Sequence, residues 1–231
     1  AGWYGMPTIS MDSVLSVARA GLQGGFQVCS HAIGDKANRE ILDRYEIAFN
    51  ENPEISDPRF RIEHAQHVHP DDIPRFGKLG VIAAMQAIHL SSDRPWAIDR
   101  LGEKRIVAET YVWQDLIKSG AMIINGTDVP VEPISPVASF YASVTRKTLS
   151  GEPEGGYEPK QKMSRVQALR SYTLDAAYGA FQESALGSIE VGKEADFTVF
   201  SQDIMTVPED KLLSTTISKT IVNGKIVYEK N

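Results

Sequence analysis

Short apolar runs alternate with amphipathic segments along residues 10–181, and this alternation predicts strands followed by helices. β-Prone runs that end at polar residues predict strands in residues 26–31, 59–64, 81–86 and 122–128. Apolar residues that recur at helical spacing predict helices in residues 10–24, 34–49, 71–79, 103–119, 137–148, 164–172 and 174–181. Strands alternating with helices are typical of an α/β protein with a parallel sheet.

Three segments between these elements are expected to be irregular. Residues 91–102 form a long connection, and residues 129–136 carry three prolines, which disfavour regular structure. Residues 150–162 are polar and rich in glycine and proline, and we expect a surface flap there.

The pattern changes near residue 184. Strands are expected in residues 196–200, 216–222 and 225–228, with no helix between the last two. Asn223-Gly224 is a strong signal for a two-residue hairpin turn. We therefore expect two domains, an α/β domain over residues 1–183 and a small antiparallel β unit over residues 184–231.

Three of the predicted strands end in side chains that can bind a metal, His31, His64 and Asp128. They are 33 and 64 residues apart, one and two βα units of nearly equal size. Because α/β folds build active sites at the carboxyl ends of parallel strands, these residues are candidates for one site. Each histidine could instead be a packed core residue, and Asp128 could cap a turn. Arg61 and Glu63 alternate with the inward-facing residues and are expected to face the helix layer.

Composition narrows the function classes. The 231 residues are 42% hydrophobic and 23% charged, as in an ordinary globular protein. The net charge of −6 argues against a nucleic-acid partner. Cys29 is the only cysteine, which excludes an internal disulfide and a cysteine-based zinc site. No apolar run approaches the roughly 20 residues of a membrane span, and no signal peptide is evident, so a cytoplasmic protein is expected. The first residue is Ala1, which leaves open an internal start.

Four segments in order carry a family resemblance: His31–Asp35, Ile62–Gln66, Gly126–Pro130 and Leu186–Asp196. Together they resemble the amidohydrolase superfamily, and most closely the family 3 branch that includes N-substituted formamide deformylase. The four predicted βα units alone are compatible with an open sheet or with part of a closed barrel, which needs eight.

The resemblance implies the C-terminal half of a (β/α)8 TIM-type barrel, strands five to eight, followed by the C-terminal strands of a small β-sandwich. It places His31 on strand five, His64 on strand six and Asp128 on strand eight, with Gln86 at the end of strand seven. The family's strand-one His-x-His pair and its strand-four metal bridge have no counterpart here. His67-x-His69 imitates that pair but follows no apolar strand, and a solvated loop before a helix is expected there.

The chemistry that the resemblance implies is metal-dependent hydrolysis of an amide-type C–N bond. His31, His64 and Asp128 are expected to bind a divalent metal, with zinc expected, and the complete enzyme is expected to hold one or two ions. Asp128 is also expected to act as general base and then acid. Weaker candidates for binding a small amide-type substrate are Gln86, His89 and Arg105.

A second hypothesis remains open. The chain could be a non-catalytic fragment or assembly module that self-associates through open sheet edges. The first hypothesis expects activity only together with the missing half, and the second expects a homo-oligomer.

Overall fold

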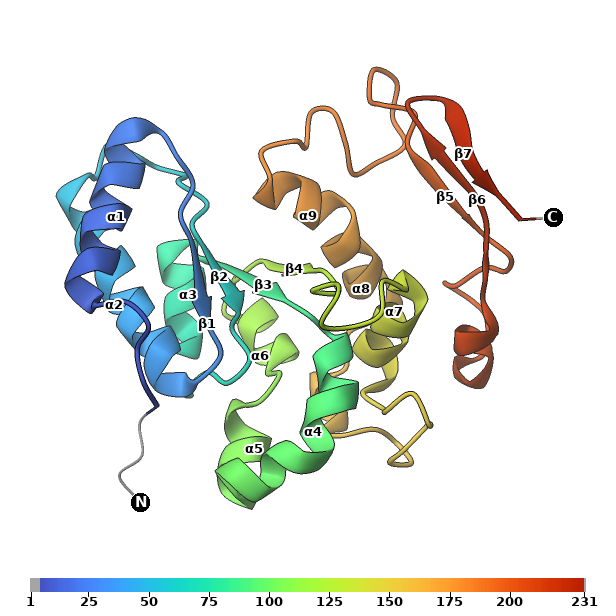
Figure 1. Ribbon diagram of the computed structural model, residues 1–231, viewed down its shortest axis with the longest axis horizontal. Helices are drawn as coiled ribbons and strands as arrows, with labels where there is room; N and C mark the ends of the chain where they lie inside the picture. Colours follow the sequence, from blue (N-terminus) through green and yellow to red (C-terminus); the bar gives the residue numbers. More distant parts are fainter. Residues whose placement is uncertain (1–4, 231) are drawn as a thin grey trace. The chain divides into compact units, whose positions relative to one another are not determined.

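The computed structural model describes residues 5–230 and contains two compact units (Figure 1). The first unit runs to Met85 and also includes Trp96–Ile123. The second comprises Gln86–Pro95 and the chain from Ile124 onward. The architecture is α/β, with a parallel sheet and a separate antiparallel sheet, as the alternating pattern predicts.

The first unit is built on a parallel sheet. Its strands β1 (Cys29–Ala32), β2 (Arg61–His64) and β3 (Ile82–Met85) pair in chain order. The start of β4 (Ile123–Asn125) follows β3, because the Ala83 amide donates to the Met122 carbonyl. The helices of this unit are α1 (Met11–Gly24), α2 (Asp35–Glu51), α3 (Ile73–Leu79), α5 (Glu103–Glu109) and α6 (Trp113–Lys118).

Helix α2 covers one face of β1 and β2. Tyr45 on this helix is fully buried, and its ring packs edge-to-face on Phe60 with 5.0 Å between centroids. The Tyr45 hydroxyl donates to Ser30 Oγ at 2.7 Å. Ile62, which pairs with Ser30 in the sheet, is also fully buried. The buried side chains of this layer therefore fix which face of the strands the helices cover.

Helix ends in this unit follow from their cap residues. Ser10 caps α1 by accepting from the Ser13 amide, and Gly25 ends the helix in the left-handed conformation with φ 69°. Such left-handed ends favour glycine, which has no Cβ to clash. Helices α3 and α6 pack so closely that a Cβ on Gly77 would lie 1.9 Å from the Ser119 carbonyl oxygen.

The prediction of an irregular connection over residues 91–102 is wrong. Helix α4 spans Ile88–Leu101 and contains Pro95. The proline removes one backbone donor from the helix interior, but side chains from the first turns are anchored elsewhere in the second unit. Ser91 Oγ accepts from the Leu149 amide at 2.8 Å, and Arg94 binds Glu158 at 2.6 Å. Tertiary contacts thus outweigh the local signal.

The single helix predicted over residues 103–119 is divided into α5 and α6. Between them Thr110 forms an isolated antiparallel bridge with His67. The Val68 amide donates to the Glu109 carbonyl at 2.8 Å, and the Tyr111 amide donates to the Gln66 carbonyl at 3.0 Å. The chain leaves helical geometry here because its backbone groups bond to the segment after β2.

Besides the first turns of α4, the described part of the second unit contains three helices and a small sheet. Its helices are α7 (Pro136–Thr145), α8 (Arg165–Tyr172) and α9 (Leu174–Gly179), with short 3₁₀ turns at Pro159–Gln161 and Glu209–Ser214. The antiparallel sheet has the order β5 (Phe197–Phe200), β6 (Ile217–Val222), β7 (Lys225–Glu229). The hairpin prediction is confirmed, since Asn223 and Gly224 link β6 and β7 with φ 48° and 71°.

A buried ionic cluster closes the 147–158 loop of this unit. Glu158 accepts from Arg94 at 2.6 Å and from Arg146 at 3.0 Å, and the Arg146 side chain is fully buried. The Arg94 guanidinium also lies 4.6 Å from the Tyr157 ring centroid. Two cations sharing one carboxylate in a low-dielectric surrounding hold this loop against α4 and the end of α7.

Candidate functional site

The first unit brings His31 and His64 together at the carboxyl ends of neighbouring strands. Ala32 pairs with His64 in the parallel ladder, and the two imidazole rings lie 4.5 Å apart between centroids at an interplanar angle of 74°. This juxtaposition follows from the βα spacing noted in the sequence. Two imidazoles at this distance present nitrogen ligands of the kind that zinc and other divalent ions accept.

The backbone turns sharply at the end of β2. His64 has φ 76° and Ala65 has φ 44°, so two consecutive non-glycine residues lie in the left-handed region. This conformation costs about 1–3 kcal/mol per residue and persists only where the surroundings impose it. Such strained residues cluster at functional sites, which agrees with a role for His64.

The expectation that Arg61 and Glu63 face the helix layer is wrong. Their ladder partners are Cys29 and His31, whereas Ser30 and Ile62 face α2. The Arg61 Nε–Glu63 Oε1 pair, 2.9 Å long, therefore lies on the face that carries His31. Desolvation raises the pKa of the Cys29 thiol on this face, with a smaller lowering by Arg61 and further raising by Glu63.

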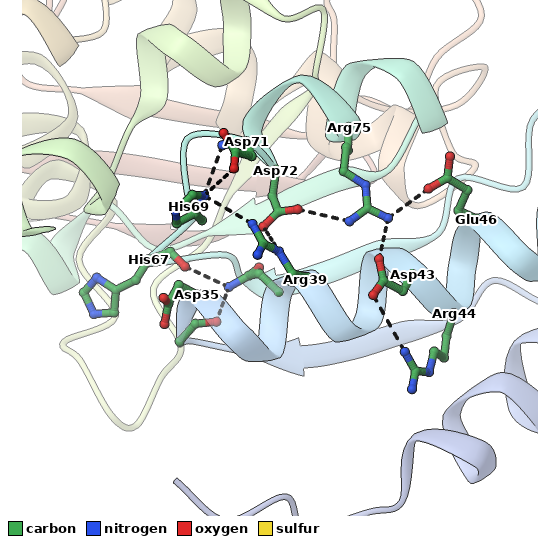
Figure 2. Close-up of polar contacts among 12 residues, drawn as sticks. Asp35, Arg39, Asp43, Arg44, Glu46, His67, His69, Asp71, Asp72 and Arg75 are labelled. Carbon is green, nitrogen blue, oxygen red and sulfur yellow. Dashed lines mark hydrogen bonds and ion pairs between the residues drawn. The ribbon is translucent and has the colours of Figure 1, made fainter. Parts of the chain in front are cut away.

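His67 is a buried structural residue rather than a solvated loop residue, so that part of the loop prediction is wrong. Its Nδ1 lies 2.9 Å from Thr110 Oγ1. Burial and, to a smaller extent, the positive charge of Arg105 lower the pKa of His67 to about 4, with Asp35 opposing the shift. His69 binds Arg39 at 3.2 Å and the Asp71 amide at 3.2 Å (Figure 2). Both imidazoles thus have structural hydrogen bonds.

The second unit places Asp128 beside His89. Asp128 follows β4 in the left-handed conformation, with φ 57°, and its side chain is 39% exposed. His89 Nε2 lies 3.5 Å from Asp128 Oδ2, and His89 Nδ1 lies 3.1 Å from Glu132 Oε1. Ser92 Oγ donates to the same Glu132 oxygen. An imidazole between two carboxylates has both ring nitrogens engaged, which fixes its orientation toward Asp128.

Sequence reasoning singled out His89 only as a substrate contact, and it missed Glu132 and Ser92. Glu132 lies in the proline-rich loop after Asp128, where no periodic pattern marks it. Its partner Ser92 lies in the segment predicted as irregular, so the helical spacing of His89 and Ser92 was not recognised. A correct helix prediction would have placed both on one face, because residues three apart are neighbours on a helix.

The other two substrate candidates have different surroundings. Gln86 directly follows β3. The Arg105 guanidinium is bound by two carboxylates in the first unit, Asp35 at 3.0 Å and Glu109 at 3.0 Å. An arginine neutralised in this way positions α5 against the start of α2. A role in substrate binding for either residue stays a prediction.

A large apolar hollow of about 940 Å³ lies in the second unit and is not lined by His89 or Asp128. Its walls come from α7, α8, α9, the segment between α9 and β5, and residues of β5 and β6. The volume of a hollow does not by itself identify a reaction site. The polar side chains that converge in this unit, His89, Asp128 and Glu132, do not line the hollow.

Comparison with known proteins identifies the family. The profile of the amidohydrolase family matches residues 4–228, and the chain belongs to this family. Protein LONG AFTER FAR-RED 3 of Arabidopsis thaliana is 37% identical over 225 residues, which are 97% of this chain and 38% of the relative. N-substituted formamide deformylase of Arthrobacter pascens is 26% identical over 207 residues, 89% of this chain and 37% of the relative.

A solved structure supports the same assignment. An uncharacterized metal-dependent hydrolase from Pyrococcus horikoshii OT3 matches with a TM-score of 0.76 and 29% identity, over 90% of this chain and 41% of that chain. The chain thus spans about two fifths of the length of these relatives. The family resemblance predicted from the four motifs is confirmed. Among residues 5–230, no helix has the length and apolar character needed to cross a membrane.

Proposed function

We propose that this chain is the C-terminal part, barrel strands five to eight, of a metal-dependent hydrolase that cleaves an amide-type C–N bond. The observation that carries the proposal is the pair of strand-end imidazoles, His31 and His64, 4.5 Å apart in a member of the amidohydrolase family. The donor set fits a divalent ion, since two imidazoles and a carboxylate suit zinc and several other metals.

In this proposal His31, His64 and Asp128 hold the ion, with zinc expected. When bound, a divalent ion lowers the pKa of a coordinated water and polarises a substrate carbonyl. Asp128 accepts the proton of the attacking water and returns it to the leaving amine. His89 holds the Asp128 carboxylate in place from its own fixed position between Asp128 and Glu132. Gln86 and Arg105 remain weaker candidates for binding the small-molecule substrate.

We expect the reaction to require the segments that the relatives have and this chain does not span. Metal binding by the histidine pair is testable in the chain itself. Zinc and cobalt binding are measured by calorimetry and by the visible spectrum of the Co²⁺ form. His31→Ala and His64→Ala are expected to lose the site, since each removes half of the imidazole pair.

The matched control is His69→Ala, which removes an imidazole that contacts the Arg39 side chain and the Asp71 backbone amide. It should bind zinc as the unaltered chain does. Equal binding by all four proteins, or none by the unaltered chain, contradicts the metal-centre proposal. In a longer protein that contains this chain and hydrolyses N-acyl amines, Asp128→Asn should reduce kcat by about 100-fold or more. A loss of this size is expected when a general base is removed.

One observation favours the alternative of an assembly module. β7 lies at one edge of its sheet, all five of its residues are exposed, and Ile226, Val227 and Tyr228 are apolar. An exposed apolar edge strand is a template for pairing with another chain. A folded homodimer in solution that binds no zinc would favour this function over hydrolysis.

A further inference from the structure

The loops that follow His31 and His64 are joined directly to each other. The Ala65 amide donates to the Ala32 carbonyl at 3.1 Å, and the His67 amide donates to the Ile33 carbonyl at 2.9 Å. These bonds continue the β1–β2 ladder beyond the last paired residues. The relative position of the two imidazoles therefore depends on how firmly these two loops are held together.

The side chain of Asn38, on the first turn of α2, lies at the centre of this junction. It is fully buried. Its Nδ2 donates to carbonyl oxygens of the loop after His31, Gly34 at 2.9 Å, Ala32 at 3.2 Å and Ile33 at 3.3 Å. It also donates to the His67 carbonyl at 3.2 Å, in the loop after His64. One amide group thus bonds to both loops.

The neighbouring residue reinforces the second loop. Arg39 donates to the buried Asp72 carboxylate at 2.7 Å and contacts His69 Nδ1 at 3.2 Å. Asp72 is held from the other side by Arg75 at 3.0 Å (Figure 2). Two consecutive residues of α2 therefore hold the segment after His64 at both of its ends.

We propose that Asn38 is a positioning residue that fixes the separation of the His31 and His64 imidazoles and so sets the affinity of the metal centre. The amide suits this task because its two N–H groups are shared among carbonyls of both loops, which no apolar side chain of similar size can do. The inference rests on the proposed function for its metal readout, whereas the ring separation can be measured without metal.

The test compares Asn38→Leu with Asn52→Leu. Asn52 is the matched control, since its side chain also donates to a backbone carbonyl, that of Ala48 at 2.8 Å, but at the far end of the same helix. Two quantities are measured: the NOE between the His31 and His64 ring protons in the metal-free chain, and the zinc affinity. Asn38→Leu should lose or weaken the NOE and bind zinc about 10-fold or more weakly, the usual effect of removing an outer-shell partner. Asn52→Leu should change neither.

The outcomes separate the two proposals. An Asn38→Leu chain that keeps the NOE and binds zinc within twofold of the unaltered chain overturns the positioning role. An unaltered chain that shows the NOE but binds no zinc overturns the metal centre, while the NOE comparison still decides the role of Asn38. If Asn38→Leu does not fold, Asn38→Ser retains one donor and is expected to give an intermediate NOE and an intermediate zinc affinity.

Discussion

At the scale of single residues, the buried polar groups carry the most specific information. His67 is an example, because its imidazole is buried beside Thr110 and its pKa is lowered to about 4. In the unfolded chain a histidine titrates near 6.5, so below that pH the unfolded state takes up the proton first. The contribution of His67 to the free energy of unfolding should therefore be constant above about pH 6.5. It should fall as the pH is lowered from about 6.5 to 4.

The expected loss is roughly 3 kcal/mol at the acid end of this range, from 1.36 kcal/mol per pKa unit. Urea denaturation at a series of pH values measures it. His67→Asn keeps a polar group near Thr110 without a titrating ring, and it should flatten this part of the profile. If the unfolding free energy of His67→Asn falls as steeply with pH as that of the unaltered chain, the lowered pKa of His67 is not its cause.

A second prediction concerns Glu158. Replacing its carboxylate with the amide of Glu158→Gln leaves Arg94 and Arg146 buried without the negative charge that they share. Breaking a buried ion pair from one side costs about 3–5 kcal/mol, and denaturant unfolding should show a loss of this order. Glu190→Gln removes an exposed partner 4.0 Å from Lys193 and should cost less than about 1 kcal/mol. Similar losses in the two variants would rule out a special role for the buried cluster.

The sequence indicates which residues lie at strand ends. It does not indicate which polar groups those residues contact. The histidine spacing placed His31 and His64 together because βα units repeat with a regular length. The partners Glu132 and Asn38 come from a loop and a helix start, where no hydrophobic period specifies side-chain direction. Burial of His67 likewise depends on Thr110, 43 residues further along the chain.

At the scale of elements, close packing between helices sets tolerance to substitution. Helices α3 and α6 meet at Gly77, where a Cβ would lie 1.9 Å from the Ser119 carbonyl oxygen. Gly77→Ala must therefore push the two helices apart, and we expect a loss of about 2–3 kcal/mol in unfolding free energy. Gly34→Ala is the control, because no other atom lies within 4 Å of its added Cβ and its φ is −75°.

Thermal or urea unfolding of Gly77→Ala and Gly34→Ala measures the loss of unfolding free energy in each variant. Gly34→Ala should cost less than about 1 kcal/mol, mainly from the weaker helix cap. An unaffected Gly77→Ala protein would show that α3 and α6 are not packed as closely as described.

The elements that the sequence failed to predict share a physical cause. Helix α4 forms despite Pro95 because side chains such as Arg94 anchor it to the 147–158 loop. The break between α5 and α6 forms because Glu109 and Tyr111 use their backbone groups for the segment after β2. Both outcomes depend on contacts remote in sequence, which override local propensity.

At the scale of the whole molecule, the alternation of strands and helices and the change to an antiparallel tail were predicted correctly. The strand order β1-β2-β3 and the hairpin at Asn223-Gly224 follow from that pattern. The boundary predicted between residues 183 and 184 stays a prediction, as does the relation of these strands to a closed barrel. Four βα units specify neighbouring pairs of strands, whereas a closed barrel of this type needs eight.

The order of the parallel strands has a consequence for how the protein is made. β2 and β3 each pair with the strand synthesised just before them, and Cys29 is followed by its ladder partner Arg61 after only 32 residues. At about 5–20 residues per second, a ribosome delivers that partner within about 2–6 seconds. During translation β2 and β3 can therefore each pair with a strand that has already been synthesised.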